Sequence, residues 1–234
     1  MDSLSRLTQV LRRMHDATIL ILPGLDGTDL MLGQFQKLCA EKHRVIVETL
    51  PADTTMDYAG LADHFASVVD ALPACHIIAE SFSGPIGILL AHRYPNIVTR
   101  LTLVASFATS PTPWMATFLP WSIIFRLPMP SMTARYFLVG RCTSLIPILK
   151  AAIRRNTPAI LCHRIRLVQN VDASIEYSGL KCRLTYLRPM DDRLVPRRCA
   201  DTMQSLNPAT VIHEIDGPHL ILETQPESSW LTIA

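Results

Sequence analysis

A serine stands at an abrupt change of pattern in the chain, within the segment IIAESFSGP at residues 77–85. The apolar residues before it predict a buried strand, and the run that begins at Pro85 predicts a helix, because proline is well tolerated in a first helical turn. A strand that turns this sharply into a helix needs small side chains two residues before and after the serine, and Ala79 and Ser83 are small. Such a turn would present the Ser81 hydroxyl at the end of a sheet, beside a helix N-terminus.

This serine also has a simpler interpretation, because serine is a common capping residue where a helix begins. Ser83 is a second candidate nucleophile in the same segment, although the small residues flank Ser81 symmetrically. A reactive serine needs partners elsewhere in the chain, so the interpretation depends on the histidines and aspartates.

A serine hydroxyl is a poor nucleophile near neutral pH and needs a base to accept its proton. A histidine can serve as that base when a carboxylate holds its other ring nitrogen. His219 lies in the turn-like segment DGPH after the last strand-like run, whereas His213 lies inside that run. Because a loop residue reaches a pocket more easily than a strand residue, His219 is the predicted base.

Two adjacent carboxylates occur in the segment RPMDDRLVP at residues 188–196. Either Asp191 or Asp192 could hold His219, and either gives the chain order serine, aspartate, histidine. The other would then be a solvated loop charge or a helix-capping acceptor. Weaker candidates for the same role are Asp26, Asp172 and Asp216.

The turn PGLDGT at residues 23–28 follows the first strand-like run. Negative charge develops on the substrate oxygen when a serine attacks a carbonyl, and backbone N–H groups can stabilise that charge. The N–H groups of Leu25 and Phe82 are the candidates for this oxyanion hole. Gly24 would let the backbone approach a substrate closely, although a turn glycine needs no such role. Asp26 is expected to brace the turn.

The elements that must position these residues follow from the alternation of apolar, β-branched runs with helix-like runs. This alternation predicts an α/β fold with a mostly parallel sheet and helices on both faces. The predicted strands are residues 18–22, 44–49, 75–79, 101–105, 183–187 and 210–215, and the main predicted helices are residues 30–40, 56–72, 85–94 and 196–206.

Ligands of such sheets bind outside the carboxyl ends of the strands. The 23–28 turn follows the first predicted strand, Ser81 the third, the Asp191-Asp192 pair the fifth and His219 the sixth. The residues that the chemistry needs are therefore expected to meet at one edge of the sheet.

Composition excludes several classes of protein. The formal charge of +2 is too small to indicate nucleic-acid binding. Residues 101–125 are free of charge but contain several prolines, which argues against a membrane span. The six cysteines form no Cys-x-x-Cys pair, which indicates reduced thiols in a cytoplasmic protein, with no disulfide framework or metal site. Residues 1–17 contain no signal-peptide core and are predicted to form an N-terminal helical arm.

Four segments together resemble the α/β-hydrolase family: LPGLDG at 22–27, AESFSG at 79–84, DRLVP at 192–196 and GPH at 217–219. The resemblance runs from about residue 18 to the C-terminus, apart from a central insertion. The Asp-x-x-Val-Pro spacing of that family falls on Asp192, which separates it from Asp191. The chain departs from the family at Ala79 and Ser83, where glycines are usual, and it offers about six strands where eight are usual.

The insertion, residues 108–179, interrupts the alternation with prolines, aromatic residues and two helix-like runs. The resemblance implies a helical cap here, inserted between the core segments 18–107 and 180–234. An apolar cap would line an acyl pocket and exclude water, although the same residues would also suit an ordinary small helical core. The predicted substrate contacts are Gly24, Trp114, Phe118 and Trp121.

Charge is distributed unevenly along the chain. Between Ser81 and Val171 there are ten basic residues and no acidic one. Such a cap could attract an amphipathic anion, for example an acyl thioester of coenzyme A, or associate weakly with a membrane surface. The charges would equally suit the solvated face of the cap helices.

Together these features predict a cofactor-free serine hydrolase that cleaves carboxylic esters of apolar acyl groups through an acyl-enzyme. In this prediction Ser81 attacks, His219 moves the proton and Asp192 orients His219. A thioesterase or acyltransferase is the nearest alternative, because the same acyl-enzyme can be resolved by different acceptors. The serine argues against the dehalogenase and epoxide-hydrolase branches, which use an aspartate there. A non-catalytic relative that serves as a binding module is the remaining alternative.

Overall fold

The computed structural model describes residues 17–112 and 119–234. Most of the predicted N-terminal arm lies outside the described residues, as do Trp114 and Phe118, two of the predicted substrate contacts.

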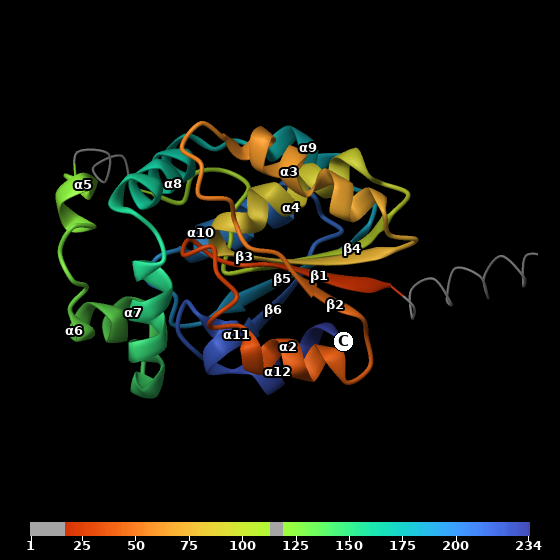
Figure 1. Cartoon of the computed structure of the whole chain (residues 1–234). Helices are drawn as coiled ribbons and strands as arrows, with labels where there is room; N and C mark the ends of the chain where they lie inside the picture. The colour runs from red at the N-terminus through yellow and green to blue at the C-terminus, as the bar shows by residue number, and fades with distance from the viewer. Residues whose placement is uncertain (1–16, 113–118) are drawn as a thin grey trace, which may run out of the picture.

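The described residues build one six-stranded sheet in which all neighbouring strands are parallel. The strand order is β2-β1-β3-β4-β5-β6 (Figure 1). The chain therefore starts inside the sheet with β1, forms the edge strand β2, and then adds β3 to β6 in turn on the other side of β1. Parallel strands need crossover connections, and the helices supply them. The predicted fold class is confirmed. The strands are β1 (Thr18–Leu22), β2 (Val45–Val47), β3 (Cys75–Glu80), β4 (Val98–Val104), β5 (Arg183–Pro189) and β6 (Val211–Ile215).

Helices cover both faces of the sheet, and each face buries its own apolar core (Figure 1). One core contains Phe65, Phe82 and Tyr186, and the other contains Phe35 and Leu187. The helices over the first core are α3 (Tyr58–Asp70), α4 (Gly84–Arg93), α9 (Ser174–Ser178) and α10 (Arg197–Leu206), and those over the second are α2 (Gly33–Ala40), α11 (Ile221–Thr224) and α12 (Pro226–Ile233).

Strand β1 has the predicted bounds, and the other five strands differ from the prediction by one to three residues at an end, most of all β4 and β2. Strand β4 begins at Val98, three residues before the predicted start, because Val98 pairs with Cys75 and Arg100 pairs with His76. The polar and partly exposed residues at this end of the strand conceal it in the sequence. Strand β2 is shorter than predicted, as is common for a strand at the edge of a sheet.

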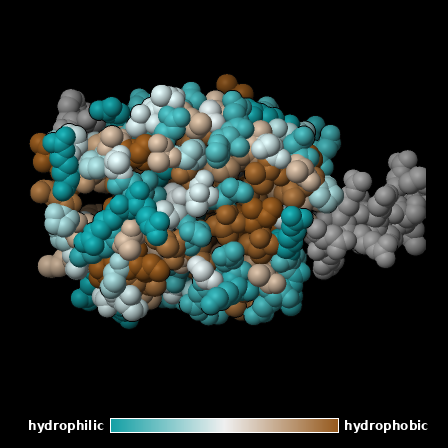
Figure 2. Space-filling model, viewed as in Figure 1, coloured by the Kyte–Doolittle hydropathy of each residue, from teal (hydrophilic) through white to brown (hydrophobic). Residues whose placement is uncertain are grey.

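Between β4 and β5 the chain forms short helices beyond the carboxyl ends of the strands, at the left of Figure 1. A separate apolar cluster joins Val139 and Leu149 of this region to Leu220 of the C-terminal part. Ile123 and Met132 stay exposed, and apolar residues reach the surface at the left edge of Figure 2. Besides α9, the described elements of this region are α5 (Trp121–Ile124), α6 (Ser131–Ala134), η3 (Arg135–Val139), η4 (Thr143–Leu145), α7 (Ile146–Arg154) and α8 (Pro158–Asn170).

Among the described helices, none is by itself long and apolar enough to cross a membrane. One pair of segments, Ser131–Val139 and Thr143–Arg154, meets the length and composition requirements jointly but is bent by 117° at the break between them.

Candidate active site

Ser81 sits at a strained turn between β3 and α4. Its φ is +47°, in the left-handed region that side chains with a Cβ rarely occupy. The turn begins directly after Glu80, the last residue of β3, and continues as one turn of 3₁₀ helix over Ser81–Ser83. Backbone strain of this kind is costly and is concentrated at functional sites.

The two residues that replace the usual glycines of this turn are both accommodated by the structure. A Cβ added to Gly87 of α4 would lie 2.9 Å from the Cβ of Ala79, so the missing side chain at position 87 leaves room for Ala79. The buried hydroxyl of Ser83 donates a hydrogen bond of 2.5 Å to the carbonyl of Pro23. Ser83 therefore ties the turn to the 23–28 loop, and its hydroxyl is directed to that backbone oxygen.

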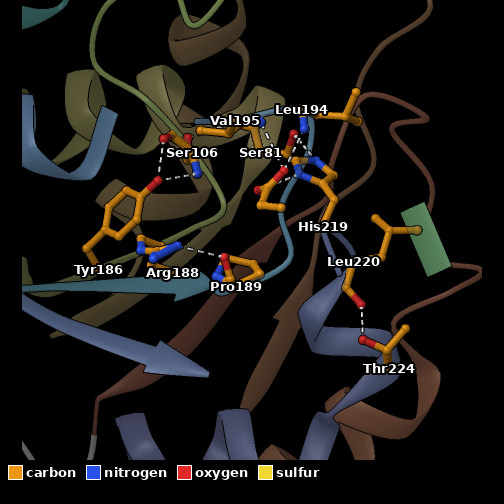
Figure 3. Close-up of polar contacts among 11 residues, drawn as sticks. Ser81, Ser106, Tyr186, Arg188, Pro189, Leu194, Val195, His219, Leu220 and Thr224 are labelled. Atoms are coloured by element: carbon orange, nitrogen blue, oxygen red, sulfur yellow. Dashed lines mark hydrogen bonds and ion pairs between the residues drawn. The ribbon is translucent and has the colours of Figure 1, made fainter. Parts of the chain in front are cut away.

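A second pair of side chains fixes the backbone beneath Ser81 (Figure 3). The Ser106 hydroxyl donates to the Ser81 carbonyl over 2.6 Å. The Tyr186 hydroxyl in turn donates to the Ser106 carbonyl over 2.6 Å and accepts from the Ser106 N–H over 3.1 Å. A chain of hydrogen bonds thus runs from β5 to the strained turn.

Ser81, His219 and Asp192 come together although they are far apart in sequence. His219 Nε2 lies 2.9 Å from Ser81 Oγ (Figure 3). His219 Nδ1 lies 2.8 Å from Asp192 Oδ2. Because the carboxylate accepts, the proton sits on Nδ1, and Nε2 is left to accept from the serine hydroxyl. The side chains of His219 and Asp192 are 4% and 2% exposed.

The backbone around Asp192 explains its place in the Asp-x-x-Val-Pro segment. Asp192 Oδ1 accepts from the N–H groups of Leu194 over 2.8 Å and Val195 over 2.9 Å. One carboxylate oxygen is thereby fixed by its own loop, and the other faces His219. Its neighbour Asp191 is exposed and joins the His219 loop only through its backbone N–H, which donates to the Gly217 carbonyl.

The structure places the other sequence candidates elsewhere. His213 lies within β6. Asp216 is exposed, and Asp172 accepts from the Ser174 N–H. Asp26 accepts from the backbone N–H and the hydroxyl of Thr28 over 3.0 and 2.5 Å, so it braces its loop as expected.

The 23–28 loop lies directly against the serine. A Cβ added to Gly24 would be 3.4 Å from Glu80 Oε2 and 3.8 Å from Ser81 Cβ. Gly24 is therefore close to Ser81, and Leu25 is the next residue after Gly24. Phe82 directly follows Ser81 in the chain. The assignment of their N–H groups to an oxyanion hole remains a prediction.

A pair of buried carboxyl groups next to the site was not predicted from the sequence. Glu80 precedes Ser81, Glu223 lies four residues after His219, and the two side chains are within hydrogen-bonding reach of each other. Burial raises the pKa of Glu80 well above its ordinary value and raises that of Glu223 to about 7. Hydrogen bonding between two carboxyl groups requires a proton, so at least one of them is neutral when they are in contact. The only sequence signal is their spacing from Ser81 and His219.

One further histidine, His76, is buried in the sheet. It is the second residue of β3, and its Nε2 is 2.8 Å from the Thr102 hydroxyl of β4. Burial and the nearby Arg100 lower the pKa of His76 well below its ordinary value. It is a neutral partner in the sheet, and its bonding partner lies too far along the chain for local patterning to indicate.

Two cavities are lined by residues of the region between β4 and β5. One of about 630 Å³ borders Pro218 of the His219 loop and is lined by Arg135, Arg141 and Arg193. The other, about 300 Å³, lies within the region between β4 and β5 and is lined by apolar side chains together with Arg126, Lys150 and Arg154. Trp121, a predicted substrate contact, stacks on Phe125 with ring centroids 5.9 Å apart. Its contact with substrate remains a prediction.

Comparisons with known proteins identify the family and agree with the fold. The model of the family described as "Alpha/beta hydrolase family" matches residues 19–228. A search of curated proteins found no matching sequence.

Solved structures of the same fold come from distant relatives. A carboxylesterase structure from Nitrososphaera gargenis has a TM-score of 0.79 at 12% identity, covering 93% of this chain and 88% of that one. The enol-lactonase from Burkholderia xenovorans LB400 has a TM-score of 0.76 at 17% identity, covering 93% of this chain and 90% of that one. A lipase-esterase related protein from Clostridium acetobutylicum has a TM-score of 0.77 at 12% identity, covering 94% of each chain. At these identities the likeness establishes the fold, and together with the family match it shows that the chain belongs to the alpha/beta hydrolase family.

Proposed function

We propose that the protein is a serine hydrolase that cleaves carboxylic esters with an apolar acyl group through an acyl-enzyme. The observation that carries this proposal is the continuous contact from Asp192 through His219 to Ser81, with both links under 3 Å. A serine on a strained turn with a buried histidine and carboxylate in line is the arrangement that activates a hydroxyl as a nucleophile.

In the first half of the reaction, Ser81 Oγ attacks the carbonyl carbon while His219 Nε2 takes the hydroxyl proton. The buried Asp192 carboxylate stabilises the imidazolium and keeps Nδ1 as the donor. The N–H groups of Leu25 and Phe82 stabilise the negative oxygen of the tetrahedral intermediate. The bond to the alcohol oxygen then breaks, and His219 returns its proton to that oxygen.

In the second half, water attacks the acyl carbon of the acyl-serine. His219 accepts a proton from the water, and the bond between the acyl group and Ser81 Oγ breaks as the histidine returns that proton to the serine. The carboxylic acid leaves, and the enzyme regains its starting state. No metal or organic cofactor is needed for any step of this path.

A panel of nitrophenyl esters of increasing acyl length tests the proposal. We expect turnover by the wild-type chain and an initial burst of nitrophenol equal to the enzyme concentration where deacylation is slow. We expect no turnover by Ser81→Ala, while Ser83→Ala retains turnover. Turnover by Ser81→Ala at the wild-type rate would rule the mechanism out.

An acyl thioesterase or acyltransferase is the second candidate, favoured by the basic surface of the region between β4 and β5. Arg126, Arg154 and Lys150 line its 300 Å³ cavity together with apolar side chains, a combination that suits an anionic acyl carrier or weak contact with an anionic lipid surface. Rates on acyl-coenzyme A and on the matching nitrophenyl ester, with and without an added alcohol, distinguish the three activities.

We further propose a cytoplasmic location. The support is that all six cysteines are free and four of them are buried, as expected for thiols kept in a reducing compartment.

A further inference from the structure

Arg164 differs from the other basic residues of the region between β4 and β5. The sequence groups it with nine other cations that would suit a solvated face, but in α8 it is only 3% exposed. Arg166, two residues further along the same helix, is exposed. Burial of a guanidinium is costly unless its N–H groups are hydrogen-bonded.

The guanidinium of Arg164 is bonded almost entirely to backbone oxygens of the core. Its Nη1 donates to the Leu25 carbonyl over 2.8 Å and to Asn156 Oδ1 over 3.1 Å. Its Nη2 donates to the carbonyls of Leu50 over 3.4 Å and Pro51 over 3.3 Å. One side chain of α8 therefore bridges the loops that follow β1 and β2.

The same guanidinium contacts both residues that the proposed mechanism uses as oxyanion donors. It bonds the carbonyl of Leu25, and its Cζ lies 6.0 Å from the centre of the Phe82 ring, within the range of a cation–π contact. No other side chain described in this structure is bonded to the Leu25 carbonyl.

The loop is closely fitted around this side chain. Gly27 has a φ of +68°, and a Cβ at that position would lie 2.6 Å from Arg164 Nη1. Asn156, itself a partner of Arg164, donates from Nδ2 to the Asp26 carbonyl over 2.6 Å. Side chains of the region between β4 and β5 thus hold the carbonyls of Leu25 and Asp26, in the two peptides that follow the Leu25 N–H. The peptide that carries the Leu25 N–H is held by the loop itself, because its Gly24 carbonyl accepts from the Gly27 N–H over 3.0 Å. Together these bonds restrict rotation of the backbone on either side of Leu25.

We propose that Arg164 is a positioning residue that fixes the oxyanion hole from the cap region, an inference that rests on the proposed function. It touches no reacting atom and acts through the Leu25 backbone and the Phe82 ring. Burial lowers the pKa of Arg164 to about 10, and the nearby Asp26 opposes that shift, so the guanidinium keeps its charge at neutral pH.

The test compares Arg164→Met, which keeps the length of the side chain but removes every donor, with Arg166→Met as a matched control on the same helix. Each full-length protein is assayed on a nitrophenyl ester and on the corresponding thionoester, in which sulfur replaces the carbonyl oxygen. Sulfur is a poor hydrogen-bond acceptor, so the ratio of the two rates reports on the oxyanion hole.

We expect Arg164→Met to lower kcat on the oxygen ester by roughly 10²-fold, as for loss of one oxyanion donor, with little change in KM. The preference for the oxygen ester over the thionoester should shrink by a similar factor, and Arg166→Met should match the wild type. If Arg164→Met does not fold, Arg164→Lys provides the same measurements, and its single ammonium should preserve only part of the preference.

Two results would overturn the inference. One is a kcat within twofold of wild type in Arg164→Met. The other is an equal loss of rate on the oxygen ester and the thionoester, because a general structural defect slows both reactions alike. A wild-type chain that hydrolyses neither ester would instead defeat the proposed function, so the two failures are distinguishable.

Discussion

The two sides of Ser81 are built from different parts of the chain. On the proton-transfer side, Asp192 and His219 come from loops that follow β5 and β6, and they meet through side-chain hydrogen bonds of 2.8 and 2.9 Å. On the other side, the loop after β1 is held by Arg164 and Asn156 from the region between β4 and β5, through bonds to backbone carbonyls. The proposed proton relay is thus built from loops that follow β5 and β6, whereas the loop of the proposed oxyanion hole is also held by residues of the region between β4 and β5.

This difference indicates that substitutions on the two sides should have separable effects. Changes at the relay should abolish nucleophilic attack on any substrate. Changes at α8 should weaken stabilisation of the negative oxygen and leave proton transfer intact. The strained turn and its supports belong to both sides, because the turn carries the serine and the Phe82 N–H together.

The largest effect is expected at the relay. Asp192→Asn should keep the geometry but favour the wrong histidine tautomer, and we expect kcat on nitrophenyl esters to fall by roughly 10³- to 10⁴-fold. Steady-state kinetics at pH 7.5 measure it. Asp191→Asn is the matched control, since its exposed side chain lies next in sequence and is not bonded to His219. Equal losses in the two variants would contradict the assignment of Asp192.

A smaller effect on both sides is expected from the support beneath the turn. Tyr186→Phe leaves the N–H and carbonyl of Ser106 without their buried partner, which costs about 1–3 kcal/mol of stability. Urea denaturation measures the loss, and the ester assay should show a lower kcat because Ser106 bonds the Ser81 carbonyl. Unchanged stability would show that the hydroxyl of Tyr186 contributes nothing to the support.

The buried carboxyl pair should make stability depend on pH. Burial raises the pKa of Glu223 to about 7 in the folded chain; the hydrogen bond with Glu80 and the nearby His219 oppose the shift, and Asp26 adds to it. The folded state therefore binds more protons than the unfolded state between pH 4.5 and 7. Stability from this group is therefore present below its ordinary pKa and lost as the pH rises towards 7.

Glu223→Gln should flatten that dependence, because a glutamine can donate to Glu80 at every pH. We expect the free energy of unfolding of the variant to exceed that of the wild type by on the order of 1 kcal/mol at pH 8, and to differ little from it at pH 4.5. Urea denaturation across this range measures the difference. Glu41→Gln, an exposed control, should follow the wild-type curve, and a Glu223→Gln curve parallel to the wild type would contradict the shared-proton pair.

The smallest effect is expected on the outer surface of the inserted helices. Arg154 is exposed and lines the 300 Å³ cavity, so Arg154→Glu should raise KM for acyl-coenzyme A a few-fold and leave neutral esters unaffected. The effect should vanish in high salt, where exposed charges are screened. Equal changes for the anionic and neutral substrates would remove a role for this surface in substrate choice.

The sequence predicted the sheet and the positions of the relay for one physical reason. The strands are apolar runs, and Ser81, Asp192 and His219 each follow a strand, so the parallel topology brings them to one edge. The resemblance to a family was needed to separate Asp192 from Asp191, since both follow β5.

What escaped prediction depends on partners that local patterning does not mark. Arg164 bonds backbone carbonyls more than one hundred residues away, and any residue type could supply a carbonyl. It therefore resembled its exposed neighbours in the sequence. Glu80 meets Glu223, and His76 meets Thr102, only because crossover connections bring distant segments together.

The central claim is that Ser81 is an activated nucleophile, and covalent labelling tests it most directly. A fluorophosphonate reacts only with an activated serine, and mass spectrometry of the digested protein locates the adduct. We predict one equivalent of label on Ser81 in the wild type and at least a hundredfold slower labelling in His219→Ala. Labelling of Ser83, or no labelling of the folded wild-type chain, would contradict the claim and favour a non-catalytic binding protein built on this fold.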